Sequence, residues 1–384
     1  MATLRSDTIS GIGTEGPVLN GGLHFRSENY LTLPKGNTTE RTATSSGIST
    51  VIGAIRYNTD SNKMECYINN KWMIVSTSEA VTTSNRGLPM GGYKRPGDET
   101  VNIIQIINIA TQSNALDFGD LTQARRKTAC IGGRVHAFNA GGFCPATSPA
   151  TVNTIDTGVF ATAGNFVDHG DLTQRADSFA GVSNSVRGVF AGGYDGSSNI
   201  NNIQFFELSN GGGTQDFGDL TAVKLAPTGA GNPTRGIFFG GESPGESGGN
   251  NTIDFITIQS TGDGVDFGDL TNKRLAASAA SNPVRAVCMG GSTPGDTNII
   301  DFVTIATTGN ASDFGDLTIP RIFLGSVSSS TRAVAFGGDT APGLTTVMDY
   351  VEIMTKNNSI DFGDLLSSAQ FQNIEGASNC HGGL

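Results

Sequence analysis

The residues in this sequence whose types and spacing could do chemistry are aspartates that recur in pairs, separated by two other residues. The motif Asp-Phe-Gly-Asp-Leu-Thr is intact at four places, and two further copies are altered; the six copies begin at Asp117, Asp168, Asp216, Asp266, Asp313 and Asp361. Paired carboxylates could bind Ca²⁺, accept hydrogen bonds in a turn, or form ion pairs. Calcium requires about six to eight converging oxygens. We therefore favour turns and ion pairs, with a calcium-binding ring as the alternative.

Basic residues recur at two places in the same repeating pattern. The signature residues of the five copies that retain phenylalanine are Asp117, Phe118, Asp120, Asp216, Phe217, Asp219, Asp266, Phe267, Asp269, Asp313, Phe314, Asp316, Asp361, Phe362 and Asp364. The cations that follow the signature are Arg126, Arg175, Lys224, Arg274 and Arg321, and a second set is Arg187, Arg235, Arg285 and Arg332. We predict buried or half-buried Asp–Arg bridges that connect neighbouring repeats.

No arrangement of residues in the sequence predicts a catalytic centre. None of the histidines has metal-ligand spacing or stands beside a candidate nucleophile; they are His24, His136, His169 and His381. The cysteines also lack metal-ligand spacing, and we predict that they are buried free thiols that pack as small hydrophobic residues; they are Cys66, Cys130, Cys144, Cys288 and Cys380. The glycine-rich stretches lack the lysine and the helix of a phosphate-binding loop. We expect a protein that is not an enzyme, with no metal and no cofactor.

The elements that position these residues repeat along the chain. A Gly-Gly pair recurs with the same period as the signature, about 50 residues, and the pairs start at Gly91, Gly141, Gly192, Gly240, Gly290 and Gly337. Each repeat contains four short strand-like segments, for example residues 274–281, 285–291, 298–305 and 312–317. We predict an all-β fold for residues 84–384, a six-bladed β-propeller whose C-terminal segment completes the N-terminal sheet. Glycine pairs allow sharp turns with positive φ.

The order of these segments resembles the kelch repeat family. In that family an arginine and small residues open the repeat, an apolar strand ends in Gly-Gly, an alternating strand follows, and an aromatic residue closes it. Here the signature phenylalanines stand where kelch repeats often have tryptophan, and His169 interrupts the series. The resemblance covers about 300 residues and implies the architecture, but kelch propellers serve many functions.

Residues 1–83 lie outside the repeats and predict a small β-rich module. Residues 51–57, 63–68 and 71–75 alternate apolar and polar residues, as half-buried strands do, so we expect hairpins at about 51–76. Two further strand-like runs lie near residues 22–25 and 30–33, and polar stretches at 34–50 and 76–84 are typical of linkers. A module of this size buries too little apolar surface to be stable alone, and we therefore expect it to pack on the repeat domain, on its own copies or in a larger assembly.

The hairpin region resembles a motif of bacteriophage tail-fibre and virion proteins, on the residues Gly53-Ala-Ile-Arg-Tyr-Asn58, Met64-Glu-Cys-Tyr67 and Lys71-Trp72. A second run, residues 19–34, resembles segments of marine phage structural proteins. The resemblance implies a virion-attachment or oligomerisation module that contains Tyr57, Tyr67 and Trp72. It also implies a virion protein, a tail-fibre or capsid-decoration component, made in the host bacterial cytoplasm and carried on the virion surface.

The loops after the Gly-Gly pairs differ from copy to copy, whereas the signature hardly changes. Variable loops on a constant scaffold are typical of a binding surface, although drift in unconstrained loops gives the same pattern. The candidate binding residues are Phe143, Tyr194, Asp195, Glu242, Asp296 and Asp339. The net charge of −11 argues against nucleic acid as a partner, and no apolar run is long enough for membrane insertion.

We therefore predict a non-enzymatic structural protein of a phage virion. Its partners would be other virion proteins through residues 1–83 and a host-surface glycan or protein through its loops. We expect a homo-oligomer, with a trimer as one option, or a multi-copy assembly. A cellular kelch-type interaction module is the first alternative, and a propeller enzyme is the least favoured one.

Overall fold

The computed structural model describes residues 35–37, 55–60, 63–68, 71–74, 85–246, 248–341, 343–366 and 370–384. Internal contacts divide the chain into two units, Met1–Thr82 and Thr83–Leu384, a boundary one residue from the one that the sequence suggests. The described residues form strands, bridges and turns but no helix, so the protein is all-β as predicted. None of these residues belongs to a helix that could cross a membrane.

The first unit contains one four-stranded sheet in the order β1 (Lys35–Gly36), β2 (Ile55–Asn58), β3 (Lys63–Ile68) and β4 (Lys71–Ile74). The last three strands form an antiparallel meander at the predicted positions. The interpretation of residues 34–50 as linker alone was wrong, because Lys35–Gly36 pairs with β2 in parallel. The predicted runs at 22–25 and 30–33, the remainder of that linker, and residues 76–84 lie outside the described residues.

The meander contains a polar contact beside its tryptophan. Glu65 is fully buried, and its Oε1 accepts a hydrogen bond of 2.9 Å from Nδ2 of Asn58. The guanidinium of Arg56 lies 4.0 Å from the other carboxylate oxygen of Glu65 and 5.6 Å from the centre of the Trp72 ring. Tyr67 and Trp72 are cross-strand partners with ring centres 5.3 Å apart, and Tyr57 is half-buried on β2.

In the part of the second unit that the structure describes, six four-stranded antiparallel sheets follow one another along the chain. Sheet 1 contains β33 (Glu375–Ser378), β5 (Arg86–Met90), β8 (Ile103–Asn108) and β9 (Leu116–Asp120). Sheet 2 contains β10 (Ala129–Gly132), β11 (His136–Ala140), β12 (Thr154–Val159) and β13 (Val167–Asp171). Sheet 3 contains β14 (Ala180–Ser183), β15 (Arg187–Ala191), β16 (Asn202–Glu207) and β17 (Gln215–Asp219).

The remaining sheets have the same order. Sheet 4 contains β18 (Thr228–Gly231), β19 (Arg235–Phe239), β20 (Asn250–Thr257) and β21 (Val265–Arg274). Sheet 5 contains β22 (Ser278–Ser281), β23 (Arg285–Met289), β24 (Ile299–Thr304) and β25 (Ser312–Asp316). Sheet 6 contains β26 (Gly325–Ser328), β27 (Arg332–Phe336), β30 (Val347–Glu352) and β31 (Ile360–Asp364). Smaller pairings join β6 (Tyr93–Arg95), β7 (Glu99–Thr100) and β32 (Gln370–Gln372), and join β28 (Asp339–Thr340) to β29 (Gly343–Leu344).

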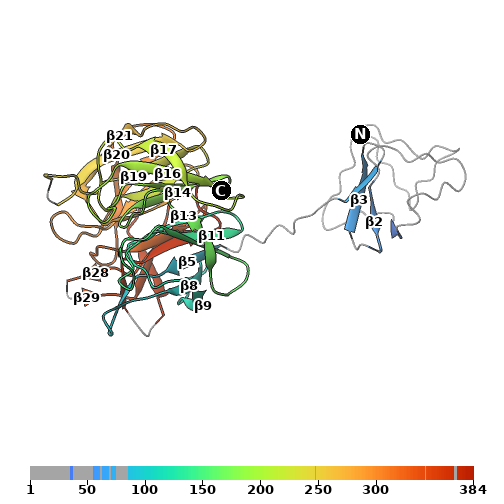
Figure 1. Cartoon of the computed structure of the whole chain (residues 1–384), viewed down its shortest axis with the longest axis horizontal. Helices are drawn as coiled ribbons and strands as arrows, with labels where there is room; N and C mark the ends of the chain where they lie inside the picture. Colours follow the sequence, from blue (N-terminus) through green and yellow to red (C-terminus); the bar gives the residue numbers. More distant parts are fainter. Residues whose placement is uncertain are drawn as a thin grey trace, which may run out of the picture. The chain divides into compact units, whose positions relative to one another are not determined.

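Sheet 1 is assembled from both ends of the second unit. Its innermost strand, β33, comes from the C-terminus and pairs antiparallel with β5, with Ala377 opposite Leu88. Figure 1 shows the red C-terminal strand beside the blue strands β5 and β8. The innermost strands contact one another in the order β33, β10, β14, β18, β22 and β26, and β26 contacts β33 again. This arrangement is consistent with a β-propeller-like fold.

Six described residues, one from each connection that leads into an innermost strand, form a ring of backbone hydrogen bonds. The N–H of each donates to the carbonyl oxygen of the preceding member over 2.8 to 3.2 Å; in ring order the members are Lys127, Ser178, Ala226, Ala276, Phe323 and Asn373. The N–H of Lys127 donates to the carbonyl of Asn373, so the last member joins the first. All six have φ between 51° and 58°, which residues other than glycine adopt rarely. We call this feature the backbone ring.

The innermost strands are shorter than the sequence suggests. Residues 274–281 were predicted as one segment, but β21 runs through Arg274 and β22 begins only at Ser278. Ala276 between them belongs to the backbone ring, and its positive φ interrupts the extended conformation. The Gly-Gly pairs do have positive φ, as predicted, with 63° at Gly290 and 100° at Gly291.

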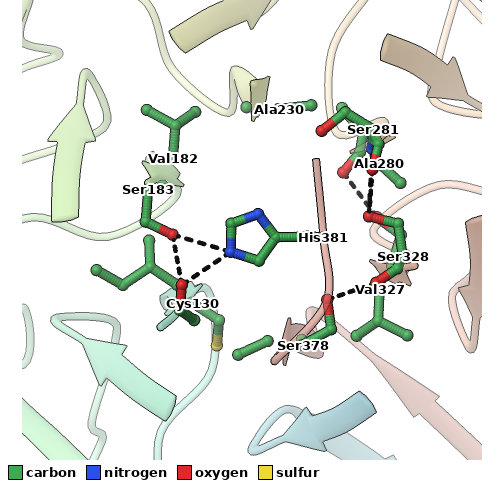
Figure 2. Close-up of a pocket in the computed structure, with 18 of the residues that line it drawn as sticks. Cys130, Val182, Ser183, Ala230, Ala280, Ser281, Val327, Ser328, Ser378 and His381 are labelled. Atoms are coloured by element: carbon green, nitrogen blue, oxygen red, sulfur yellow. Dashed lines mark hydrogen bonds between the residues drawn. The ribbon is translucent and has the colours of Figure 1, made fainter. Parts of the chain in front are cut away.

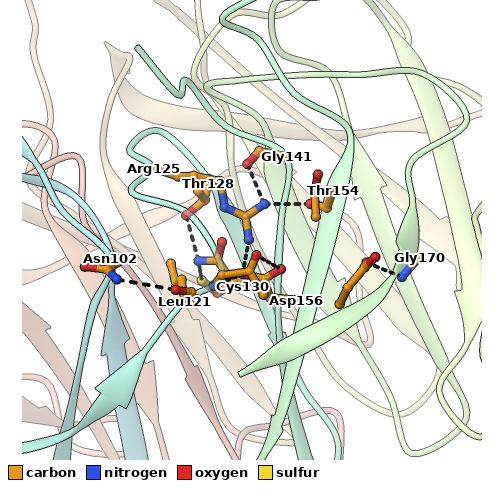
Figure 3. Close-up of polar contacts among 12 residues, drawn as sticks. Asn102, Leu121, Arg125, Thr128, Cys130, Gly141, Thr154, Asp156 and Gly170 are labelled. Atoms are coloured by element: carbon orange, nitrogen blue, oxygen red, sulfur yellow. Dashed lines mark hydrogen bonds and ion pairs between the residues drawn. The ribbon is translucent and has the colours of Figure 1, made fainter. Parts of the chain in front are cut away.

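Buried ion pairs connect four of the sheet boundaries. In each pair, a cation that follows the last strand of one sheet reaches an aspartate on the third strand of the next; the pairs are Arg125–Asp156 (2.6 Å), Lys224–Asp254 (3.1 Å), Arg274–Asp301 and Arg321–Asp349 (2.8 Å). All eight side chains are at most 1% exposed. Figure 3 shows Arg125 directed at Asp156, with hydrogen bonds from Nη1 to the carbonyls of Gly141 and Thr154. We call these pairs the buried clamps.

These clamps correct the predicted bridges in two ways. The aspartates that take part belong to the third strands and not to the signature, whose first aspartates are exposed; these are Asp117, Asp168, Asp216, Asp266, Asp313 and Asp361. The clamp after the first signature also uses Arg125 and not Arg126. The cation must stand three residues after the signature threonine, and Arg126 and Arg175 miss that position by one residue in opposite directions.

The signature serves a different contact between neighbouring sheets. Its glycine lies against the loop between the third and fourth strands of the next sheet, so that a Cβ on Gly268 would lie 2.5 Å from the carbonyl carbon of Gly309. The N–H of Asp269 donates a hydrogen bond to Oδ1 of Asn310 in the same loop over 3.0 Å. Gly363 and Asp364 make the equivalent contacts with Ser113 and Asn114, from sheet 6 to sheet 1.

The second set of predicted bridge cations binds carbonyl oxygens and aromatic rings instead of aspartates. The guanidinium of Arg285 lies 4.8 Å from the centre of the Phe302 ring, and its Nη1 donates to the carbonyl of Ile353 in the next sheet (3.3 Å). Arg187 and Arg235 repeat this geometry towards sheet 4 and sheet 5, and Arg332 donates to the carbonyl of Ala110, from sheet 6 to sheet 1. Arg187 and Arg332 pair with glutamates of their own sheet.

Candidate binding face

The strands of each sheet are antiparallel, so its connections fall at two opposite ends. One end, which we call the loop face, carries the loops after the Gly-Gly pairs, such as residues 141–153, and also the backbone ring. The other end, which we call the turn face, carries the turns between first and second strands, such as residues 133–135. The chain enters the unit at the turn face, where the N–H of Arg86 donates to Oδ1 of Asn379 (3.1 Å). The variable loops and the entering chain therefore lie at opposite ends of the sheets.

Four of the predicted binding residues hold equivalent structural positions directly after a Gly-Gly pair. Each forms an isolated antiparallel bridge with the segment that leads to the backbone ring; the residues are Phe143, Tyr194, Glu242 and Asp339, bridged to Arg126, Asp177, Leu225 and Ile322. These bridges fix the start of each loop, and the variable part of the loop begins after them. The guanidinium of Arg126 lies 5.0 Å from the centre of the Phe143 ring and covers one side of that ring.

The other two predicted residues lie further along their loops. The carboxylate of Asp195 is occupied by its own loop, since Oδ1 accepts hydrogen bonds from the backbone of Ser197 (2.7 Å) and Ser198 (2.8 Å). Asp296 is exposed and forms a bridge with Ser292. The structure thus places all six predicted residues on the loop face but does not bring them together into one site.

The loop face contains two clefts that the sequence interpretation did not find. The first has a volume of 480 Å³ and lies between the loop of sheet 2 and the segments that follow β9 and β13; Gln123, Ser148, Asn153 and Arg175 line it. We call it the Arg175 cleft. The second has a volume of 360 Å³ and is lined by Asn199, Glu242 and Glu246. Of the predicted binding residues, only Glu242 lines a cleft.

The register of the sequence contains a signal for Arg175. The clamp position of the second repeat is held by Ala176, which is fully buried, so Arg175 stands one residue before that position and is exposed. No hydrogen bond or ion pair with another described residue engages its guanidinium, and it lines the cleft. A cation that lies one residue away from the clamp position is therefore available to bind a ligand, whereas the cations at the clamp position form buried ion pairs.

The six innermost strands surround a central channel, and the C-terminal residues 379–384, which we call the C-terminal seal, lie at its turn-face end. Figure 2 shows His381 in the middle of the channel, between the inner strands. Its Nε2 lies 2.8 Å from the carbonyl oxygen of Gly132 and 3.3 Å from Oγ of Ser183, and its Nδ1 accepts a hydrogen bond from the N–H of Gly383 (3.1 Å). The proton of the neutral imidazole must therefore be on Nε2. Burial lowers the pKa of His381.

A carboxyl group and a thiol lie in the interior of the same channel. Glu375, at the start of β33, lines two small spaces of 40 Å³ each, and burial raises its pKa to about 8. The carboxyl group is thus mostly protonated at neutral pH. Burial and the neighbouring Glu375 also raise the pKa of the Cys130 thiol, and Nδ2 of Asn139 donates to its sulfur (3.1 Å). A protonated thiol is a weak nucleophile.

The chemistry that these groups can perform is limited. Across the described residues, no group of three or more His, Cys, Asp or Glu side chains is placed to hold a metal ion. The described cysteines are free thiols, but the prediction that they are buried holds only for Cys144 and Cys288, since Cys66, Cys130 and Cys380 are half-buried. The loop face instead offers amides, hydroxyls, a guanidinium and carboxylates at the surface of two clefts. No family model matches this sequence, and a search of curated proteins finds no match.

Proposed function

We propose that the second unit is a closed six-bladed β-propeller that acts as a non-enzymatic binding scaffold of a bacteriophage virion. Support for closure comes from contacts that repeat between consecutive sheets and recur between sheet 6 and sheet 1. These are the backbone-ring bond from Asn373 to Phe323, the contact of Gly363 with Ser113, and the bond from Arg332 to Ala110. The kelch resemblance of the repeats favours the same architecture.

The contrast between constant boundaries and variable loops supports a binding role most directly. Contacts between sheets recur at the same positions of the repeat, with the signature glycine at all six boundaries and a buried ion pair at four, because each boundary must satisfy buried backbone groups and buried side chains. The loops after the Gly-Gly pairs differ in sequence beyond their first residue, and residues of these loops contribute to the lining of both clefts, with Asn153 in one and Glu242 in the other. A rigid scaffold that presents different polar groups at one end suits recognition of an external partner.

The first unit would attach the scaffold to the particle. Residues 1–82 would bind other virion proteins, and the loop face of the second unit would bind a host-surface glycan or protein. The resemblance of residues 53–72 to phage virion hairpins supports this role. Among the described residues β4 is an edge strand of the sheet, and an edge strand would suit pairing with a neighbouring copy or another virion protein.

Purification of the parent particle, followed by mass spectrometry and electron microscopy, tests this function. We expect the chain as a stoichiometric virion component with the propeller outermost. A variant that lacks residues 1–82 should fold yet fail to join the particle. If the chain is absent from particles, or if the shortened chain is incorporated normally, the proposed function is wrong and a cellular interaction module becomes the better account.

A further inference from the structure

The Arg175 cleft holds several polar groups that the protein itself does not use. No hydrogen bond with another described residue engages the side chains of Arg175 or Asn153, and Oε1 of Gln123 is buried without a partner. Gln123 and Asn153 are planar amides, each with two N–H donors and one carbonyl acceptor, and Arg175 adds five donors in a fixed fork. Their positions on one cleft make it a surface with unsatisfied hydrogen-bonding capacity.

The loop that forms one wall of the cleft is fixed by its own hydrogen bonds. Oγ1 of Thr147 donates to the carbonyls of Cys144 (3.1 Å) and Pro149 (2.9 Å). Oγ1 of Thr151 is buried and donates to the carboxylate of Asp177 over 2.8 Å. The N–H of Cys144 donates to the carbonyl of Ala150 across the loop (2.7 Å). A wall held in this way loses little conformational freedom when a ligand binds.

The charge of the lining distinguishes the two clefts of the loop face. Arg175 is the single charged residue that lines the first cleft, and no carboxylate lines it, although the chain as a whole carries a net charge of −11. The second cleft has the opposite character, because Glu242 and Glu246 line it and no cation does. An anionic ligand would therefore be attracted to the first cleft and repelled by the second.

We propose that the Arg175 cleft binds a carboxylate-bearing saccharide. The guanidinium fork of Arg175 matches the two oxygens of a carboxylate, and the amides of Gln123 and Asn153 match neighbouring sugar hydroxyls, which both donate and accept hydrogen bonds. A volume of 480 Å³ accommodates one or two sugar rings. This inference rests on the proposed function in one respect, that the loop face is the face turned towards an external partner.

Binding of the full-length protein to a panel of immobilised oligosaccharides tests the proposal. The panel contains galacturonic-acid and sialic-acid oligomers, together with the same oligomers as methyl esters, which keep the hydroxyls but remove the charge. We expect binding to at least one acidic oligomer and loss of about tenfold or more in affinity for its methyl ester. Arg175→Gln should cause a similar loss, and Asn153→Ala a smaller one. Arg134→Gln, which removes an exposed arginine of the turn face, is the matched control and should bind normally.

The outcomes separate this inference from the proposed function. Acidic oligomers that bind the Arg175→Gln variant as well as the unaltered protein would overturn the inference, and so would a panel to which the unaltered protein does not bind. Neither result bears on whether the chain is a virion component. Conversely, charge-dependent binding that requires Arg175 would support the inference even if the chain is absent from purified particles, in which case the virion role alone fails.

Discussion

The boundary between sheets 4 and 5 and the boundary between sheets 2 and 3 solve one packing problem with different chemistry. At the first, Arg274 lies against Asp301, and both side chains are fully buried. At the second, the equivalent positions hold Ala176 and Gln204, which are also buried but carry no charge. At the boundary between sheets 6 and 1, buried Gln105 occupies the aspartate position. The residue at the corresponding cation position is Ala369, which lies outside the described residues.

The comparison teaches that the two members of a clamp change together. A buried carboxylate without its cation, or the reverse, is costly because either charge alone keeps its full desolvation penalty. Glutamine also forms hydrogen bonds here, but with a different partner: Oε1 of Gln204 accepts from Oγ1 of Thr214 (2.7 Å), whereas Asp301 accepts from the signature residue Thr271. Aromatic contacts also hold the neutral boundary, since the His169 ring centre lies 5.0 Å from that of Phe138 and 5.2 Å from that of Phe206.

The largest expected effect follows from removal of one charge at the charged boundary. Asp301→Ala leaves the guanidinium of Arg274 buried without its partner and should destabilise the second unit by about 3–5 kcal/mol in chemical denaturation. The double variant Arg274→Met with Asp301→Leu should recover most of that loss. Glu352→Ala, which breaks the exposed pair with Arg332, is the control and should cost less than about 1 kcal/mol. A small effect of Asp301→Ala would show that the clamps do not hold the sheets together.

The neutral boundary should respond less. Gln204→Ala removes hydrogen bonds with Thr214 (2.7 Å) and with the carbonyl of Gln174 (2.7 Å), and we expect a loss of about 1–3 kcal/mol. Gln204→Asp should cost more than Gln204→Ala, because it buries an unpaired carboxylate. Adding Ala176→Arg to Gln204→Asp should then restore stability. Denaturation curves of the unaltered protein, the two single variants and the double variant measure these differences. If Ala176→Arg gives no recovery of stability, the comparison of the two boundaries is wrong.

Both kinds of boundary share the signature glycine, and its replacement should be harmful at either. Gly268→Ala places a methyl group 2.5 Å from the backbone of Gly309, at a residue whose φ is 142°. We expect a loss of at least about 1–3 kcal/mol in the free energy of unfolding. Gly211→Ala, at a position with open space around it, should be close to neutral. Equal effects at the two positions would remove the packing explanation for the signature.

Glu375 in the central channel is a third case, because no ion pair with another described residue engages its carboxyl group. Its folded pKa of about 8 lies above the ordinary value of 4.5. The associated stability is therefore full below pH 4.5 and is lost as the pH rises through 8. Glu375→Gln keeps the shape without the charge, so it should match the unaltered protein near pH 4.5 and melt at least about 2 °C higher at pH 9. Parallel melting curves at all pH values would contradict the assignment.

The smallest expected effect concerns the C-terminal seal. A second proton on His381 would fall on Nδ1, which already accepts the N–H of Gly383, so protonation weakens the seal. Since the folded pKa lies below the ordinary 6.5, stability should decline as the pH falls below 6.5. In a Glu375→Gln background, His381→Gln should flatten this decline by up to about 1 kcal/mol. Burial also lowers the pKa of His169. His169→Phe therefore measures how much the neutral boundary contributes to the decline of stability at low pH.

Much of the second unit could be predicted from the sequence because its repeats are local and periodic. The Gly-Gly pairs and the alternating third segments mark strands whose register depends on residues close in the chain. The partners in the clamps could not be predicted in this way, because Arg274 contacts Asp301 across a sheet boundary. The signature aspartates and the third-strand aspartates carry the same charge, so charge alone does not identify the partner. The useful signal is the offset from the signature threonine, which separates the clamp residue Arg125 from the exposed Arg175.

Other features depend on contacts that have no periodic signal. The strand Lys35–Gly36 is only two residues long and forms because it lies beside β2. The seal depends on a histidine near the chain end that meets Gly132, far away in sequence. The Arg175 cleft is formed by three segments from different parts of two repeats. A sequence can identify the variable loops, but it does not place the side chains of Gln123 and Asn153 on the same surface.

Hydrogen exchange of the six backbone-ring amides tests the central claim, closure of the sheets into one ring, most directly. The amides of Asn373 and Lys127 form the ring bonds on the two sides of the segment that leads to β33, since they donate to Phe323 and to Asn373, and the amides of Ala226 and Ala276 lie within the series. We predict that exchange measured by mass spectrometry or NMR is equally slow at all four, because each opens only when the whole ring opens. Fast exchange at Lys127 and Asn373 beside slow exchange at Ala226 and Ala276 would mean an open stack of sheets and would contradict the account.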